Sequence, residues 1–562
     1  MLKYIFSIFF SLLSLLTIAQ GEANVWYFGF GAGIDFNTTP PSALTDGMLS
    51  TDEGCSSICD SDGNLLFYSN GETIFNRNHQ FMENGTGLAG HFSSTQSALI
   101  VPQPLSSHLY MIFTVGAEVG LTSAHDGLSY SIIDMDLDNG NGAVIEKNIQ
   151  LLNYTSEKQT AVRHANGRDI WIVTHLFESN AFYSFLLTCD GVQPDPIISF
   201  AGKPHIEPNL GCCEAYSTLG CMKSSPDNKK LAVVWSELTG YDAQAGSVRG
   251  DWHLELFNFD NSAGKLSNPI SMSYGNNSNL NKSYGICFSP DNTKLYQTAY
   301  QGVPSSKLFQ YDLTAADIPA SQIIIAEESI KAFGTMEIGP NGKIYIARTN
   351  GHKFLSVLNN PNALGDNTDY EKEGISLDGI NSTWGLPNIL YDYSFKPIFD
   401  FLPSDTTICN DESLLLEMES LNAESYLWND GNTFSNTSIQ SSGWHWLEVN
   451  SENCGEGRDS IYVTVEDCNC EVKFPNAFSP NGDNENDAFQ PVRANCNYEF
   501  YDLKIYSRWG EVVFASNDKH QSWDGYFKGK KESVGVYVYY LNYKSIGNDK
   551  MQQVVGDISL MW

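Results

Sequence analysis

The stretch Asp483-Asn484-Glu485-Asn486-Asp487 is the part of the sequence whose residue types and spacing come nearest to a metal site. Carboxylates at alternate positions can supply oxygen ligands to Ca²⁺. The stretch lacks the glycine at the sixth position and the distal glutamate of an EF-hand calcium loop. We therefore favour a structural Asn/Asp turn and no required cofactor, with a Ca²⁺ site built from Asp483, Glu485 and Asp487 as the alternative.

Catalytic motifs are absent from the sequence. It contains no Gly-x-Ser-x-Gly, no His-Glu-x-x-His, no Walker loop and no dinucleotide-binding fingerprint. The glycine-rich stretch Gly29-Phe30-Gly31-Ala32-Gly33 precedes no helix, so we interpret it as a turn after a strand rather than a phosphate site. The motifs thus favour a protein that is not an enzyme, without deciding the question.

The elements that must position any site are repeated β units between Val25 and Ser394. Each unit has two β-rich stretches around a turn such as Ser225-Pro226-Asp227-Asn228. Proline fixes φ in such turns, and Asn or Gly accepts positive φ. The units begin about every 44 to 64 residues, a spacing that fits four-stranded blades and the turns of WD40-like and YVTN-type β-propellers, which they resemble.

We therefore predict an all-β fold in which residues 24–395 form a β-propeller of seven blades, with six or eight as alternatives. The seventh blade would be closed by Val25–Phe28 pairing with strands near residues 384–393.

A propeller fold predicts where ligand-binding side chains gather. Inner strands start at the upper mouth of the central channel and second strands end there, so loops from all blades converge on it. The residues predicted at this mouth are Glu53, Gln96, His175, Glu237, Tyr284, Glu337, Arg348 and Trp384. They could hold a sugar or another polar small molecule; alternatively, they satisfy backbone groups of their own loops.

The charge balance excludes two classes of partner. The 562 residues include 32 Lys+Arg and 66 Asp+Glu, a net charge of −34. Such a surface repels nucleic acid and anionic lipid.

A chain of this length also predicts two to four domains.

The N-terminus has the pattern of a signal peptide over residues 1–19. Lys3 supplies the positive charge, Tyr4–Ile18 is apolar, and Thr17-Ile18-Ala19 offers small residues for cleavage. The apolar run is short for a membrane anchor, and no other segment is apolar enough to span a bilayer. We expect a mature protein without a transmembrane segment.

The twelve cysteines of an exported chain suggest disulfides. The predicted groupings are Cys55 with Cys59, two among Cys212, Cys213 and Cys221, Cys409 with Cys454, and Cys468 or Cys470 with Cys496.

Two further β modules are predicted after a linker at residues 396–404. In residues 405–467 the order Cys409, Trp428, Cys454 resembles that of immunoglobulin-like sandwiches, and the module resembles Ig-like or PKD-like spacers. Residues 470–562 form the last module.

Four motifs of the last module occur in a set order, at residues 474–487, 503–510, 523–525 and 535–539. Together they resemble the gliding motility-associated C-terminal domain, the type B sorting domain of the type IX secretion system of Bacteroidetes. The residues that carry the resemblance include Pro480, Asn481, Gly482, Asp483, Asn486, Asp487, Arg508, Trp509, Gly510, Trp523, Asp524 and Gly525. Asn484 departs from the family, which has a second glycine there. The resemblance implies export, the outer-membrane secretion machinery as partner, and a location outside the cell or on the outer face of the outer membrane.

Our leading hypothesis is therefore a secreted or cell-surface protein whose propeller binds a ligand such as a glycan or a protein. The alternatives are a lactonase-like propeller hydrolase that uses a divalent cation, and a purely structural surface protein.

Overall fold

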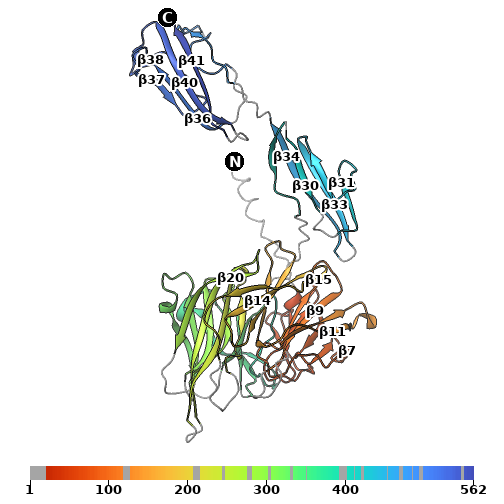
Figure 1. The fold of residues 1–562 in the computed structure, drawn as a ribbon. Coiled ribbons are helices and arrows are strands. Elements are labelled where there is room, and N and C mark those ends of the chain that lie inside the picture. The colour runs from red at the N-terminus through yellow and green to blue at the C-terminus, as the bar shows by residue number, and fades with distance from the viewer. Residues whose placement is uncertain are drawn as a thin grey trace, which may run out of the picture. The chain divides into compact units, whose positions relative to one another are not determined.

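The computed structural model confirms an all-β fold, with 54% of residues in strands and 3% in helices. It describes residues 21–117, 127–206, 216–242, 247–274, 281–301, 305–328, 333–349, 351–391, 401–410, 412–418, 423–451, 454–466, 472–483, 485–492, 498–545 and 550–562. The predicted signal peptide lies outside these residues. The chain divides into two units, Met1–Ile398 and Phe399–Trp562 (Figure 1).

Six hydrogen-bonded sheets follow one another along the first unit, and they form the predicted propeller. One of them has eight strands and consists of two four-stranded parts joined by a single pairing between Ala143 and Glu83. Counting these parts separately gives seven groups of strands, which we number as sheets. The first has three strands: β1 (Val25–Phe28), β2 (Ala32–Asp35) and β3 (Ser42–Leu44). The second and third are β4 (Ser56–Cys59), β5 (Leu65–Ser69), β6 (Thr73–Asn76) and β7 (Phe81–Thr86), then β8 (Ala98–Pro102), β9 (Leu109–Val115), β10 (Leu128–Asp134) and β11 (Ala143–Leu152). The fourth comprises β12 (Thr155–Arg163), β13 (Ile170–Leu176), β14 (Ala181–Thr188), β15 (Gly191–Val192) and β16 (Ile197–Phe200).

Three four-stranded sheets complete the series. The fifth consists of β17 (Met222–Ser224), β18 (Lys230–Asp242), β19 (Ser247–Asp260) and β20 (Lys265–Tyr274). The sixth consists of β21 (Asn281–Phe288), β22 (Lys294–Gln301), β23 (Ser306–Asp312) and β24 (Ile323–Glu328). The seventh consists of β25 (Phe333–Ile338), β26 (Ile344–Arg348), β27 (Phe354–Leu358) and β28 (Tyr370–Ser376). Four short 3₁₀ turns lie between strands: η1 (Gly21–Ala23), η2 (Asp138–Gly140), η3 (Pro319–Ser321) and η4 (Gly365–Thr368).

The repeated turns link neighbouring sheets through asparagine side chains. Asn228 and Asn292 have φ of 59° and 63°, the conformation for which asparagine is favoured. Three asparagine Oδ1 atoms accept hydrogen bonds from backbone N–H groups of the preceding sheet's turn: Asn228 from Arg163 (2.9 Å), Asn292 from Asp227 (3.0 Å) and Asn362 from Asp291 (3.2 Å). The same residues thus shape the turns and join the sheets.

The segment 384–391 lies between the second and seventh sheets of the propeller. The Trp384 N–H donates to Asp52, Pro387 forms a parallel bridge with Cys55, and Thr335 of β25 donates to the Trp384 carbonyl. Among the described strands β1 pairs with β2 only. The segment thus pairs with Cys55 next to β4, and not with β1 as predicted.

Polar side chains from several sheets meet around Asn388 in the centre of the propeller. Its Oδ1 accepts hydrogen bonds from Gln96 and Lys223, at 3.3 Å each, and its Nδ2 donates to the carbonyl of Gln159. Lys223 also forms a buried ion pair with Glu337. Because Asn388 is itself buried, side chains fill the channel at this level.

The second unit contains two separate cores. The first core belongs to two sheets and contains the buried Trp428. One sheet consists of β29 (Thr406–Cys409), β34 (Gly455–Glu466), β33 (Gly443–Ser451) and β31 (Ser425–Trp428). The other is the pair β30 (Leu414–Glu417) and β32 (Asn436–Ile439). The second belongs to β35 (Ala477–Phe478), β41 (Gln552–Leu560), β40 (Gly535–Ser545), β36 (Tyr498–Tyr506) and β37 (Val512–Ser516), with the hairpin β38 (Tyr526–Phe527), β39 (Lys530–Lys531). The predicted boundaries of the two modules stay predictions.

Candidate ligand-binding site

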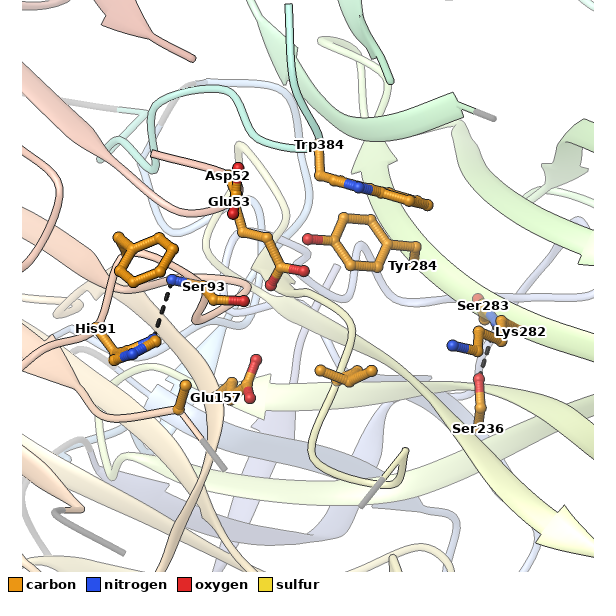
Figure 2. A pocket seen from close by; sticks show the side chains of 13 residues that line it. Asp52, Glu53, His91, Ser93, Glu157, Ser236, Lys282, Ser283, Tyr284 and Trp384 are labelled. Atoms are coloured by element: carbon orange, nitrogen blue, oxygen red, sulfur yellow. Dashed lines mark hydrogen bonds between the residues drawn. The ribbon is translucent and has the colours of Figure 1, made fainter. Parts of the chain in front are cut away.

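A cavity of about 320 Å³ opens where five successive sheets meet the segment after β28 (Figure 2). It is lined by Asp52, Glu53, His91, Phe92, Ser93, Ala117, Glu157, Leu219, Ser236, Lys282, Ser283, Tyr284 and Trp384. Most of these residues precede or begin an inner strand, where loops of neighbouring blades converge. The mouth cavity, as we call it, is therefore a product of the propeller topology.

Three of the eight residues predicted at the channel mouth line this cavity together. Glu53 comes from the loop before β4, Tyr284 from β21 and Trp384 from the segment after β28. The other five are not among the lining residues, and the structure gives each a different partner.

Gln96 and Glu337 lie in the polar centre described above. Gln96 exchanges hydrogen bonds with the backbone of Met222, and Glu337 pairs with Lys223. Arg348 forms a two-pronged ion pair with Glu328, with N–O distances of 2.7 and 2.6 Å. These contacts tie the three side chains to other strands of the propeller.

His175 and Glu237 lie at two ends of a stacked row of rings. His175 stacks on His205 and His205 on Trp235, each at 3.8 Å between ring centroids, and Trp235 stacks on His253. The His253 Nε2 lies 3.2 Å from Glu237. Burial lowers the pKa of His175 well below its usual value, so its ring stays neutral.

Sequence reasoning missed Glu157, a central residue of the mouth cavity. It lies in β12, where the pairing with β13 is irregular between Thr155 and Gln159. Such a bulge changes which face a side chain takes, so simple alternation could not place Glu157. Asp52 and Lys282 were also missed, although Asp52 lies in the loop before β4 and Lys282 is the second residue of β21.

Two carboxylates face each other across the cavity (Figure 2). Glu157 is 2% exposed, and one of its oxygens accepts hydrogen bonds from the backbone N–H and the hydroxyl of Thr95, at 2.9 and 3.1 Å. Burial raises the pKa of Glu53 well above its usual value, and the negative charge of Glu157 raises it further. The pair therefore favours holding a proton on Glu53.

Aromatic rings form one wall of the cavity. Tyr284 and Trp384 lie with ring centroids 5.0 Å apart, and the Tyr284 hydroxyl faces the Glu53 carboxylate (Figure 2). Tyr284 is 6% exposed, and its hydroxyl interacts with the Glu53 carboxylate and with Thr95. The aromatic wall therefore ends in a polar group beside the carboxylates.

The positive groups at the cavity edge already have contacts of their own. The Lys282 ammonium lies 3.6 Å from the centre of the Tyr216 ring. The Nδ1 of His91 accepts the backbone N–H of Ser93 at 3.2 Å, so that nitrogen carries no proton in this arrangement.

The spacing of the mouth carboxylates does not form a tight metal cage. Within the described ranges, no three of the His, Cys, Asp and Glu side chains that line the mouth cavity bring ligand atoms within 4.8 Å of one another. The cavity therefore combines carboxylates with aromatic rings.

The predicted disulfide between Cys55 and Cys59 is wrong, because both thiols are free and buried. Cys55 immediately precedes the extended strand β4 and Cys59 ends it. Their Cα atoms are therefore roughly 13 Å apart, whereas a disulfide needs about 4.4–6.8 Å. Cys221 is also free, which removes it from its predicted grouping.

Other cysteine predictions have partial answers. Cys409 and Cys454 are both disulfide-bonded, while their pairing with each other stays a prediction. The remaining predicted positions, Cys212, Cys213, Cys468, Cys470 and Cys496, lie outside the described residues.

The acidic stretch of the last module has a turn geometry. Asp487 accepts the backbone N–H of Gly482 at 2.7 Å, and Asp483 accepts that of Glu485 at 2.8 Å. These contacts agree with the structural turn that we favoured. Calcium binding there remains untested, and Asn484 lies outside the described residues.

The other sorting motifs divide into buried and exposed parts. Trp523 is 1% exposed and packs in the core of the last module, and Asp524 accepts the N–H of Tyr526. Trp509 is 86% exposed beside Arg508, in a turn that Gly510 closes with a φ of 81°.

Comparison with known proteins bears on the last module. Residues 472–558 match the family model of the CHU_C type IX secretion signal domain. The chain thus ends in a type IX secretion sorting domain, as its motifs predicted, and this signal implies export to the cell surface or beyond it.

The similarities of the whole chain to known proteins are less specific. No curated protein matches it. Similar solved structures include a protein from Lactobacillus plantarum (10% identity, TM-score 0.37, covering 65% of this chain and 99% of that one), the Pseudomonas aeruginosa periplasmic gluconolactonase PpgL (10%, 0.23, 72% and 96%) and the C-terminal WD40 domain of Sif2 (12%, 0.30, 60% and 78%). Similarities this low carry no argument about activity.

Within the residues that the structure describes, no helix is long and apolar enough to cross a bilayer.

Proposed function

We propose that the propeller binds a small polar ligand in the mouth cavity, on a protein that the type IX system delivers to the outer face of the outer membrane or releases. The observation that carries this proposal is the cavity of about 320 Å³, which places the Glu53 and Glu157 carboxylates beside the Tyr284 and Trp384 rings. A concave site with aromatic walls and a few convergent polar groups is typical of small-molecule binding. The carboxylate oxygens can accept hydrogen bonds from a ligand.

The geometry favours binding over the alternatives. A divalent-cation hydrolase needs several oxygen or nitrogen ligands close together, and the described mouth residues do not provide three within 4.8 Å. A purely structural propeller needs no cavity lined by three carboxylates and aromatic rings where five sheets converge.

A ligand panel tests the binding proposal on the full secreted chain. Thermal unfolding is followed with monosaccharides, disaccharides, small amines and amino-acid derivatives, for the wild type, Trp384→Ala and the control Trp444→Ala. Trp444 is an exposed residue of the second unit. We expect one ligand class to raise the melting temperature of the wild type and of the control, and not of Trp384→Ala. If no class raises it, the binding proposal is overturned.

The delivery route is tested by removing residues 470–562. We expect the shortened chain to accumulate in the periplasm, because it lacks the sorting domain. Fractionation and immunoblotting of cells report its location. Normal appearance of the shortened chain at the surface would contradict this part of the proposal.

A further inference from the structure

The charges of the mouth cavity restrict the chemistry of its ligand; this inference rests on the binding proposal above. Three carboxylates line the cavity, those of Asp52, Glu53 and Glu157. The one lysine of the lining, Lys282, has its ammonium over the Tyr216 ring. The protein as a whole carries −34. Even with a proton on Glu53, the Asp52 and Glu157 carboxylates outnumber the lysine ammonium, so an anionic ligand would meet repulsion both on approach and in the cavity.

The aromatic wall adds a second preference. Tyr284 and Trp384 lie 5.0 Å apart at an angle of 57°, so their rings offer two differently oriented faces, and Phe92 lines the cavity as well. Ring faces attract cations electrostatically, best when the cation is an organic ammonium that has shed its water. Carboxylates beside aromatic faces complement an ammonium group.

We propose that the mouth cavity is a receptor for an ammonium group, which sits between the Glu53 and Glu157 carboxylates and against the Tyr284 and Trp384 rings. Glu53 then loses its proton to solvent as the cation enters, so that one positive charge replaces another. Glu157 keeps its hydrogen bonds from Thr95 and serves as the fixed negative charge.

This exchange predicts that affinity depends on pH. The groups that face Glu53 are Glu157, Asp52, Tyr284, Lys282, Cys221 and, across the cavity, His91. Below the pKa of Glu53, binding must expel a proton, so the affinity for a cation rises up to about tenfold per pH unit. Above that pKa the affinity becomes constant.

Choline is the probe, because its quaternary ammonium charge does not titrate. Its matched control is 3,3-dimethyl-1-butanol, a neutral molecule of the same shape. Isothermal titration calorimetry of the full secreted chain between pH 5 and 8, in two buffers of different ionisation enthalpy, gives both the affinity and the number of protons released. Two further probes show which kind of ammonium compound binds. Nα-acetyl-lysine amide represents a lysine side chain of a peptide, and putrescine represents a free amine.

The variant Glu53→Gln removes the exchangeable proton while it keeps the shape of the neutral side chain, so it should fold. Glu83→Gln, at an exposed position on β7, is the control. We expect choline to bind wild type and Glu83→Gln with proton release, and Glu53→Gln to bind at least tenfold more weakly at pH 8 without pH dependence. Because His91 is present in all three proteins, the difference isolates Glu53.

The possible outcomes separate the two proposals. Binding of neutral sugars but not of ammonium compounds would overturn the ammonium receptor and leave the binding proposal intact. Equal affinity for choline and its neutral analogue, or tight Ca²⁺ binding without choline binding, would also overturn it. If nothing binds, both proposals fail.

Discussion

The ion pair between Lys223 and Glu337 predicts a large loss of stability when one partner is removed. Their side chains are 4% and 1% exposed. Burial alone would lower the pKa of Lys223, but the Glu337 carboxylate raises it above its ordinary value, so the lysine stays charged. Glu337→Gln would leave this charge buried without a counter-charge, a change that typically costs about 3–5 kcal/mol.

The expected melting shift follows from the size of the propeller. With about 2.1 cal/mol/K of unfolding entropy per residue over about 370 residues, that loss lowers the melting temperature by roughly 4–6 °C. Differential scanning calorimetry of the full chain measures the propeller transition. The control is Glu327→Gln, which removes the half-exposed partner of Lys307 and should cost less than about 1 kcal/mol.

A double variant makes the reasoning sharper. Lys223→Met with Glu337→Leu removes both charges and keeps an apolar filling, so it should be far more stable than Glu337→Gln. The reasoning is refuted if Glu337→Gln melts within 1 °C of Glu327→Gln, or if the double variant is the least stable protein.

Three further predictions concern other regions. Trp509→Ala should leave the melting temperature of the second unit almost unchanged, because the side chain is 86% exposed, whereas Trp523→Ala should cost about 3–5 kcal/mol; equal losses would contradict the packing. The raised pKa of Glu53 makes the folded state bind more protons than the unfolded state. The free energy of unfolding should therefore fall as the pH rises above the ordinary pKa of a glutamate, and Glu53→Gln should remove this pH dependence in calorimetry. The same pH dependence in wild type and variant would refute the prediction. Cys55 and Cys59, with thiol pKa values raised by burial, should resist thiol reagents until the protein unfolds, and a disulfide between them in mass spectra would disprove the assignment.

The blades could be predicted from the sequence because their signals are local. Proline, aspartate and asparagine in turns such as 225–228 and 289–292 set backbone angles within a few residues. The pairing of residues 384–391 could not be predicted in the same way. It joins Pro387 to Cys55, residues far apart in the chain, and depends on how the ring of sheets closes.

The mouth cavity was partly predictable for a similar reason. Topology alone brings Glu53, Tyr284 and Trp384 to one place, because each lies near the entry of an inner strand or segment. Glu337 was misplaced because it is the next-to-last residue of β25 and faces the polar centre. Glu157 was missed because the irregular pairing of β12 changes the face on which it lies.

The most direct test of the ligand proposals is a crystal structure of the full secreted chain grown with choline at pH 8. The account predicts density for the ammonium group between the Glu53 and Glu157 carboxylates, in contact with the Tyr284 and Trp384 rings. An empty mouth cavity, or choline bound elsewhere on the protein, would contradict it.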